Sequence, residues 1–139
     1  MIIVDTNVIS ELMRSSGTSE VFRWAAQQIP TELWTTTINE AEIFYGVELI
    51  SRGRRRDQMQ SDAEDMFGED FLNRILPFDS QAARAYARIV ARRRTLGKPI
   101  GQADAQIVAI AQVHGAAIAT RDVDDFADCG IRVINPWTS

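Results

Sequence analysis

The sequence predicts an α/β protein built on one central parallel sheet. Two short apolar runs, Met1–Val4 and Ala116–Thr120, are typical of buried strands. Helical stretches with apolar stripes lie between such runs, and we expect them to cover both faces of the sheet. Each of the two runs leads into an acidic residue, Asp5 after the first and Asp122 after the second. Because ligands bind at the carboxyl ends of strands in open α/β sheets, these acids are candidate site residues.

Composition fits a single domain over residues 1–139, with 45% hydrophobic and 24% charged residues. No apolar run approaches the roughly 20 residues needed to span a bilayer, and the N-terminus lacks the pattern of a signal peptide. Cys129 is the single cysteine, so no internal disulfide can form and we expect a cytoplasmic protein. Cys129 and the single histidine, His114, also argue against a thiol protease, a zinc site or a histidine-based triad.

The formal charge of −4 does not by itself indicate nucleic-acid binding. The basic residues are nevertheless concentrated in two clusters: Arg52, Arg54, Arg55 and Arg56, then Arg88, Arg92, Arg93, Arg94 and Lys98. Such clusters are either solvated helix faces or contacts for a phosphodiester substrate.

The N-terminal third predicts two helices and a second strand. Thr6 and Asn7 open a helix that continues to Leu12, although Asp5 or Asn7 would also serve as a helix cap without any further role. A turn at 15–18 leads, with Thr18 or Ser19 as the cap, into a helix that carries Trp24 in the core. Pro30 ends this helix, and a strand follows over 32–36.

The middle of the chain predicts a helical hairpin and a third strand. A capping box over 37–40 precedes a helix over 41–50, in which Glu42 lies at the edge of the apolar stripe. Glu42 is therefore either a surface residue or a site residue. Residues 51–68 continue as a hairpin with its tip at 52–56. The strand at 74–78 contains Pro77, which indicates a sheet edge or the end of the strand.

The last third predicts two helices and two strands, with another acid in an unusual place. One helix starts at Asp79 or Ser80, and another runs from Gly101 to His114 and ends at Gly115. Asp104 is on the buried face of the second helix, where an unpaired carboxylate would cost several kcal/mol. A site role therefore explains Asp104 better than a structural one. Strands are predicted at 116–120 and 131–134, and Asp122 and Asp125 are possible N-cap and N3 residues of a short helix between them. We expect Trp137 to anchor the C-terminal tail.

Four acids, namely Asp5, Glu42, Asp104 and Asp122, are thus candidates for one site. Two carboxylates about 4 Å apart repel by roughly 4 kcal/mol at an effective dielectric of about 20. Convergence therefore requires either bound protons or a divalent cation. Oxygen ligands without histidine suit Mg²⁺ or Mn²⁺, and the simplest chemistry is a metal-activated water that attacks a phosphodiester.

Seven segments carry a resemblance to a known family: Val4–Glu11, Ala41–Gly46, Ile75–Asp79, Gly97–Ile100, Ala103–Ile107, Ala119–Asp122 and Ile134–Trp137. They cover essentially the whole chain in order. In these segments the sequence resembles PIN-domain ribonucleases, specifically the toxins of VapBC-type toxin–antitoxin pairs in the FitB-like branch.

The resemblance implies a three-layer α/β/α sandwich with a parallel sheet and an acidic site at Asp5, Glu42, Asp104 and Asp122. Asp5 and Asp104 would be metal ligands, with Mg²⁺ expected and Mn²⁺ also suitable. Thr6, Asn7 and Thr120 would position the acids through hydrogen bonds, and Asp125 is the alternative to Asp122. The implied partners are an RNA substrate, a cognate antitoxin and a second copy of the chain in a homodimer, within a larger toxin–antitoxin assembly.

Two other classes remain open on sequence alone. An aspartyl-nucleophile phosphatase also begins with a strand that ends in Asp, but it usually has a second Asp at the position of Asn7. A non-catalytic RNA-binding or partner-binding module would not need all four acids. The sequence does not identify the RNA, the cleavage site, the antitoxin, or whether one or two ions bind.

Overall fold

Five parallel strands form the central sheet of the computed structural model, which describes residues 1–14 and 20–138. The strands are β1 (Ile2–Val4), β2 (Leu33–Thr36), β3 (Ile75–Leu76), β4 (Ala117–Ala119) and β5 (Val133–Ile134), arranged in the order β3-β2-β1-β4-β5. The predicted α/β class with a parallel sheet is confirmed. β3 is an edge strand, as Pro77 indicated. The predicted turn at 15–18 and the cap at Thr18 or Ser19 lie outside the described residues.

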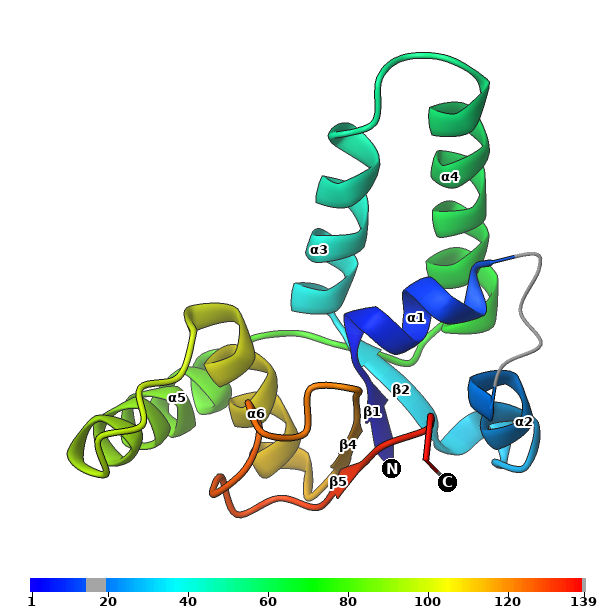
Figure 1. Ribbon diagram of the computed structural model, residues 1–139. Coiled ribbons are helices and arrows are strands. Elements are labelled where there is room, and N and C mark those ends of the chain that lie inside the picture. Colours follow the sequence, from blue (N-terminus) through cyan, green and yellow to red (C-terminus); the bar gives the residue numbers. More distant parts are fainter. Residues whose placement is uncertain (15–19, 139) are drawn as a thin grey trace.

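Helices cover both faces of the sheet and complete a three-layer sandwich (Figure 1). One layer contains α1 (Thr6–Leu12), α2 (Glu20–Ala26), α3 (Thr37–Glu48) and α4 (Arg54–Asp65), and the other contains α5 (Ser80–Thr95) and α6 (Gln102–His114). A 3-10 turn, Pro30–Glu32, precedes β2, and a π-helical turn, Met66–Asp70, follows α4. None of the described helices is long and apolar enough to cross a membrane.

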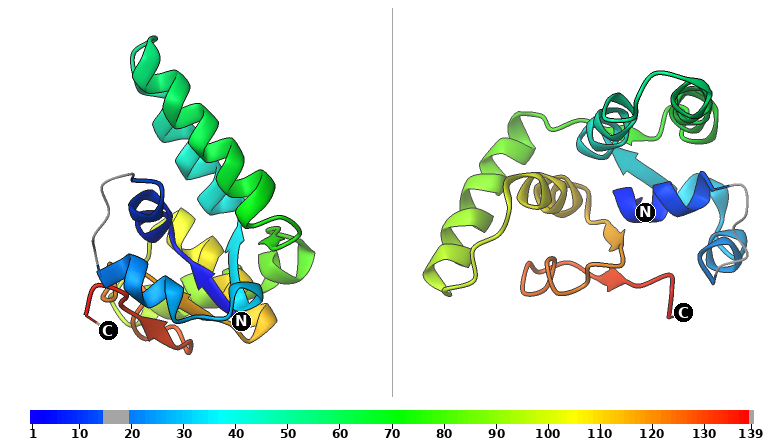
Figure 2. Two further views of the ribbon diagram at one scale, coloured as in Figure 1. Left: turned by 90° about the vertical axis from the view of Figure 1, so that its right-hand side faces the viewer. Right: turned by 45° about the horizontal axis from the view of Figure 1, so that its top comes forward.

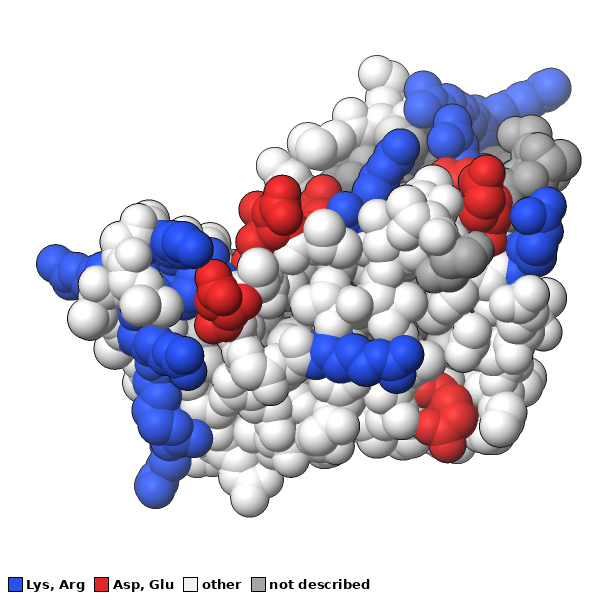
Figure 3. Space-filling view, turned by 60° about the horizontal axis from the view of Figure 1, so that its bottom comes forward, with Lys and Arg blue, Asp and Glu red and all other residues white. Residues whose placement is uncertain are grey.

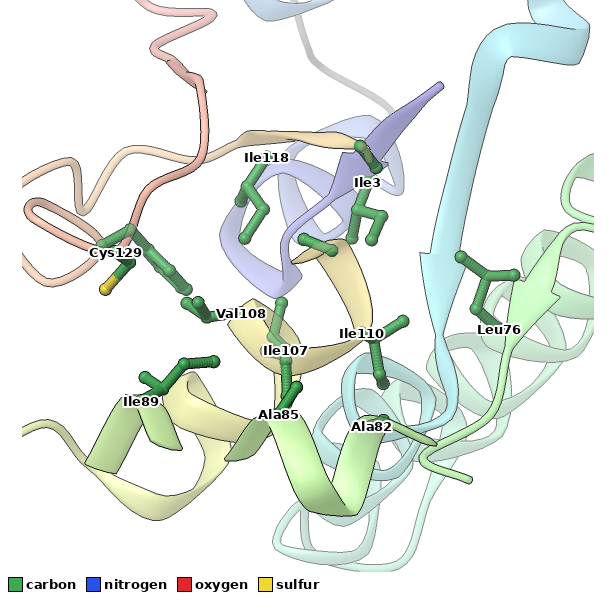
Figure 4. Close-up of a cluster of buried hydrophobic side chains, with 14 residues drawn as sticks. Ile3, Leu76, Ala82, Ala85, Ile89, Ile107, Val108, Ile110, Ile118 and Cys129 are labelled. Atoms are coloured by element: carbon green, nitrogen blue, oxygen red, sulfur yellow. The ribbon is translucent and has the colours of Figure 1, made fainter. Parts of the chain in front are cut away.

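Successive residues of β1 pack into two separate hydrophobic clusters, as expected for a strand covered on both faces. Ile3 belongs to a cluster that also contains residues of α5 and α6, including Ile89 and Ile107, which Figure 4 labels. Val4 belongs to the cluster that α1 to α4 form on the opposite face. Trp24 is 5% exposed, which confirms its predicted place in the core.

α3 and α4 form a helical hairpin that projects from the body of the molecule (Figure 2). The basic tip that the sequence placed at 52–56 lies in the connecting turn and the first turn of α4. The hairpin stands beside the carboxyl end of the sheet because α3 begins directly after β2, at Thr37.

The predicted start of α3 was wrong by four residues. The helix begins at Thr37 instead of Ala41, and its cap is Thr36 rather than Thr37. Thr36 has the extended backbone of a cap (φ −128°, ψ 162°), and its hydroxyl accepts the Asn39 N–H at 3.2 Å and donates to Asn39 Oδ1 at 2.6 Å. The partner of the cap is therefore Asn39, not Glu40. The short helix considered for 122–125 is also absent, since this segment forms turns.

One of the predicted basic clusters is divided between the surface and the core. Basic side chains gather at the left of the face in Figure 3, where α5 lies. Arg88, Arg92 and Arg94 are exposed, but Arg93 is 6% exposed and is not part of a solvated face. Its guanidinium donates to the carbonyl of Lys98 at 2.7 Å and to the carbonyls of Asp125 and Ala127 at 3.3 and 2.9 Å. The last two hydrogen bonds connect the segment between β4 and β5 to α5.

Candidate active site

Asp5 is the buried floor of the site, at the end of β1. It is 5% exposed, and its Oδ1 accepts the Thr6 N–H at 2.8 Å and the Asn39 Nδ2 at 3.0 Å. Its Oδ2 accepts the Thr120 hydroxyl at 2.7 Å. Three of the roughly four acceptor positions of this carboxylate are thus used by the protein, and about one remains. Asp5 is also the N-cap of α1, so the capping and site interpretations are compatible.

The parallel register explains why Asp5 and Thr120 meet. Val4 pairs with Ala119, so the next residues of β1 and β4 leave the sheet side by side. Burial raises the pKa of Asp5 above its ordinary value, and the negative charge of Asp122 adds to the rise. Hydrogen bonds from Thr120, Thr6 and Asn39 oppose the rise. The protein therefore holds this carboxyl in one orientation in a place that disfavours its charge.

Glu42 reaches the site from α3. It is exposed, and its Oε1 accepts the Thr6 hydroxyl at 2.7 Å. The Thr6 oxygen in turn accepts the Asn39 side chain at 3.0 Å. Thr6 and Asn39 thus link Glu42 to Asp5 across α1 and α3.

Asp122 reaches the site from the segment after β4. Its Oδ2 accepts the Asn7 side-chain amide at 3.0 Å, and its backbone N–H donates to the Thr120 hydroxyl oxygen at 3.0 Å. Asn7 also accepts the Arg121 N–H at 3.2 Å, so one side chain orients this whole segment. Thr6, Asn7 and Thr120 thus each donate a side-chain hydrogen bond to one of the acids.

Asp104 completes the set from the first turn of α6. It is half-buried, and among the described residues it has no hydrogen-bond partner. Its pKa is raised from 3.8 to about 6, first by burial and then by the charges of Asp5, Asp125, Glu42 and Asp122, in that order. The charges of the other three acids and of Asp125 therefore act on Asp104 through space.

The four acids line one cavity of about 640 Å³, which we call the acidic cleft. Asn7 and Glu11 of α1 line it, as do Arg14, which follows the end of α1, and Arg55 and Met59 of α4. Asp122 lines the cavity and Asp125 does not, although the charge of Asp125 acts on Asp104 more strongly than that of Asp122. Within residues 1–14 and 20–138, no group of three or more Asp, Glu, His or Cys side chains is arranged to hold a metal ion.

Sequence reasoning missed Asn39 and did not place Arg14 or Arg121 in the cleft. Asn39 is fully buried and connects Thr36, Asp5 and Thr6. The sequence did contain a signal for the burial of Asn39, because Asn39 precedes Ile43 and Val47 at helical spacing and therefore lies on the buried face of α3.

Trp137 packs against the core, as expected for a tail anchor, and also lines the cleft. The Arg121 guanidinium lies 5.0 Å from the centre of its ring.

Comparison with known proteins gives consistent similarities over the whole chain. The model of the PIN domain matches residues 2–131. The chain is 40% identical over 137 residues to the VapC ribonuclease Y4jK of Sinorhizobium fredii, covering 99% of this chain and 98% of the relative. It is 37% identical over 137 residues to the toxin FitB of Neisseria gonorrhoeae, covering 99% of each chain. In the solved structure of FitAB bound to the IR36 DNA fragment, one chain superimposes with a TM-score of 0.91 at 37% identity, covering 99% of this chain and 96% of that one.

Proposed function

The chain belongs to the PIN-domain family, and on that basis we propose that it is a metal-dependent ribonuclease and the toxin of a toxin–antitoxin pair. The names of its relatives, a VapC ribonuclease and the toxin FitB, support both parts of the proposal. The observation that carries it is the acidic cleft itself. Four carboxylates from four separate segments line one cavity at the carboxyl end of the sheet.

The donor set of the cleft fits a hard divalent cation. The four acids offer only carboxylate oxygens as metal ligands. Asp104 is half-buried and has no hydrogen-bond partner among the described residues, so its carboxylate is free to bind an ion. Asp5 retains about one acceptor position of its carboxylate. Mg²⁺ usually takes one or two carboxylates and fills its other positions with water or phosphate oxygens, so it does not need three converging acids. We assign Asp5 and Asp104 as the ligands of Mg²⁺, with Mn²⁺ also suitable.

When bound, such an ion lowers the pKa of a water and neutralises charge on the phosphate. The residues of the chain hold the reacting groups in place. Thr6 fixes Glu42, and Asn7 fixes Asp122, so these two carboxylates can accept hydrogen bonds from the attacking water or from waters around the ion. Asp122 is the better candidate for the fourth acid because it lines the cleft, whereas Asp125 acts on Asp104 through its charge.

The proposed partners are RNA, a cognate antitoxin and a second copy of the chain, in a cytoplasmic toxin–antitoxin assembly. The solved FitAB complex of a relative supports the antitoxin. Tyr45 of α3 and Leu49, the C-cap of that helix, are 65% and 68% exposed, which supports a protein partner on the hairpin. Light scattering of the purified chain, alone and co-expressed with its antitoxin, tests the homodimer and the complex.

The central experiment incubates the purified protein with a panel of cellular RNAs in Mg²⁺, in Mn²⁺ and in EDTA. We expect cleavage in the presence of either metal, none in EDTA, and none with Asp104→Asn. Asp65→Asn is the matched control, because Asp65 is an exposed aspartate at the end of α4 and outside the cleft. Full activity after exhaustive EDTA treatment, or in Asp104→Asn, would contradict the proposal.

A further inference from the structure

Three arginines line the acidic cleft together with the four acids. Arg14 follows the end of α1, Arg55 is in the first turn of α4, and Arg121 lies between β4 and Asp122. They come from three separate segments of the chain, so their presence in one cavity is a property of the tertiary structure.

These arginines do not neutralise the acids of the site. Arg121 lies over the Trp137 ring, and within residues 1–14 and 20–138 the one ion pair of Arg14 is with Glu11, at 3.5 Å, with 70% of the Arg14 side chain exposed. Within the described part of the chain, Arg55 makes no hydrogen bond or ion pair. Its neighbour Arg56, in contrast, pairs with Glu48 at 2.6 Å. Arg14 and Arg55, which we call the basic rim, therefore present guanidinium groups that are available to a ligand.

The basic rim is displaced from the acids along the cleft. Asp5 caps the N-terminus of α1, whereas Arg14 lies beyond the C-terminal end of this seven-residue helix, which is about 10 Å long at the helical rise. Arg55 and Met59 lie one helical turn apart on α4 and line the cleft from the hairpin. Asp5 thus lies at the end of a strand, and the two rim arginines line the cleft from the far end of α1 and from the hairpin.

We propose that the basic rim binds a backbone phosphate of the RNA strand next to the phosphate that is cleaved. This inference rests on the proposed ribonuclease function. The carboxylates of the acidic cleft repel the phosphates of the strand that do not react there. Guanidinium groups bind phosphate oxygens in a bidentate manner, so the rim offsets this repulsion and sets the direction of the strand in the cleft.

The test measures binding of a fluorescent single-stranded RNA by anisotropy in EDTA, over a series of salt concentrations. Each phosphate contact in a single strand contributes about 0.7 to the slope of log K against log salt. Arg55→Gln and Arg14→Gln should each reduce that slope by about 0.7 and weaken binding. Arg54→Gln is the matched control, because Arg54 is exposed, adjacent on the same turn of α4 and outside the cleft. With metal present, Arg55→Gln should raise KM and leave kcat nearly unchanged.

Equal effects of Arg54→Gln and Arg55→Gln would overturn the inference, because they would indicate general attraction to the surface charge. Unchanged slopes in both rim variants would overturn it as well, as would weaker antitoxin binding without any change in RNA binding. The proposed function fails separately, if the wild-type protein with metal leaves every RNA of the panel intact. Cleavage by the wild type with no effect of the rim variants would refute this inference alone.

Discussion

Replacing Asp104 by asparagine should stabilise the metal-free protein at neutral pH while abolishing cleavage. A rise in the pKa of Asp104 from 3.8 to about 6 corresponds to at most about 3 kcal/mol of unfavourable free energy when the group is ionised. Asp104 is only half-buried and solvent screens part of this cost, so we expect a gain on the order of 1 kcal/mol, or about 3 °C in Tm.

The stability difference between Asp104→Asn and wild type should depend on pH, in a direction that the raised pKa of Asp104 determines. Because the folded-state pKa is raised, the folded protein carries no penalty from Asp104 below about pH 3.8, where the carboxyl is neutral in both states. The penalty grows between pH 3.8 and about 6 and is constant above that range. The stability difference between Asp104→Asn and wild type should therefore be near zero at pH 4 and reach its full value at pH 7.5.

The assay is urea unfolding in EDTA at these two pH values, followed by tryptophan fluorescence, since the buried Trp24 reports on the core. Asp65→Asn, in the same buffers, controls for the loss of one negative charge. Adding Mg²⁺ should stabilise the wild type more than Asp104→Asn, because a ligand stabilises the state that binds it. A variant that is less stable than wild type at pH 7.5, or whose gain is equal at both pH values, would refute the reasoning and make Asp104 structural.

Three further predictions concern groups around the site. Asn39→Ala removes the buried amide that donates to Asp5, so it should lower the free energy of unfolding by about 2–4 kcal/mol and reduce cleavage; a fully active, equally stable variant would contradict this. Arg93→Met leaves the carbonyls of Asp125 and Ala127 without their donor, so it should lower the free energy of unfolding by about 2–4 kcal/mol and speed hydrogen exchange in residues 122–130. Unchanged exchange would show that the β4–β5 connection is stable without these hydrogen bonds. An arginine-bearing peptide from the antitoxin tail should compete with Mg²⁺ at matched ionic strength. Glu42→Gln and Asp104→Asn should each weaken binding of this peptide by roughly 1.5–3 kcal/mol. Unchanged affinity in both variants would show that the antitoxin binds another surface.

The sequence by itself determined the architecture, because its signals are local. Apolar runs such as Met1–Val4 are long enough only for buried strands, and the helical repeat after Asp104 shows which face is buried. Pro77 marked the edge strand, and Gly115 ended α6 in the left-handed conformation (φ 62°) that glycine adopts easily. The four acids were also found from local context, since each follows a strand or lies on an apolar-edged helix.

Only the tertiary structure decided which groups act on one another. Asn39 donates to Asp5 across 34 positions of the sequence, and Asp122 lines the cleft while Asp125 does not. Likewise, Arg55 lines the cleft although its neighbour Arg54 does not. Periodicity reports the face on which a residue lies, but a hydrogen bond or a shared cavity depends on how separate helices and strands are placed relative to one another. That placement results from packing of the whole core, which no single segment encodes.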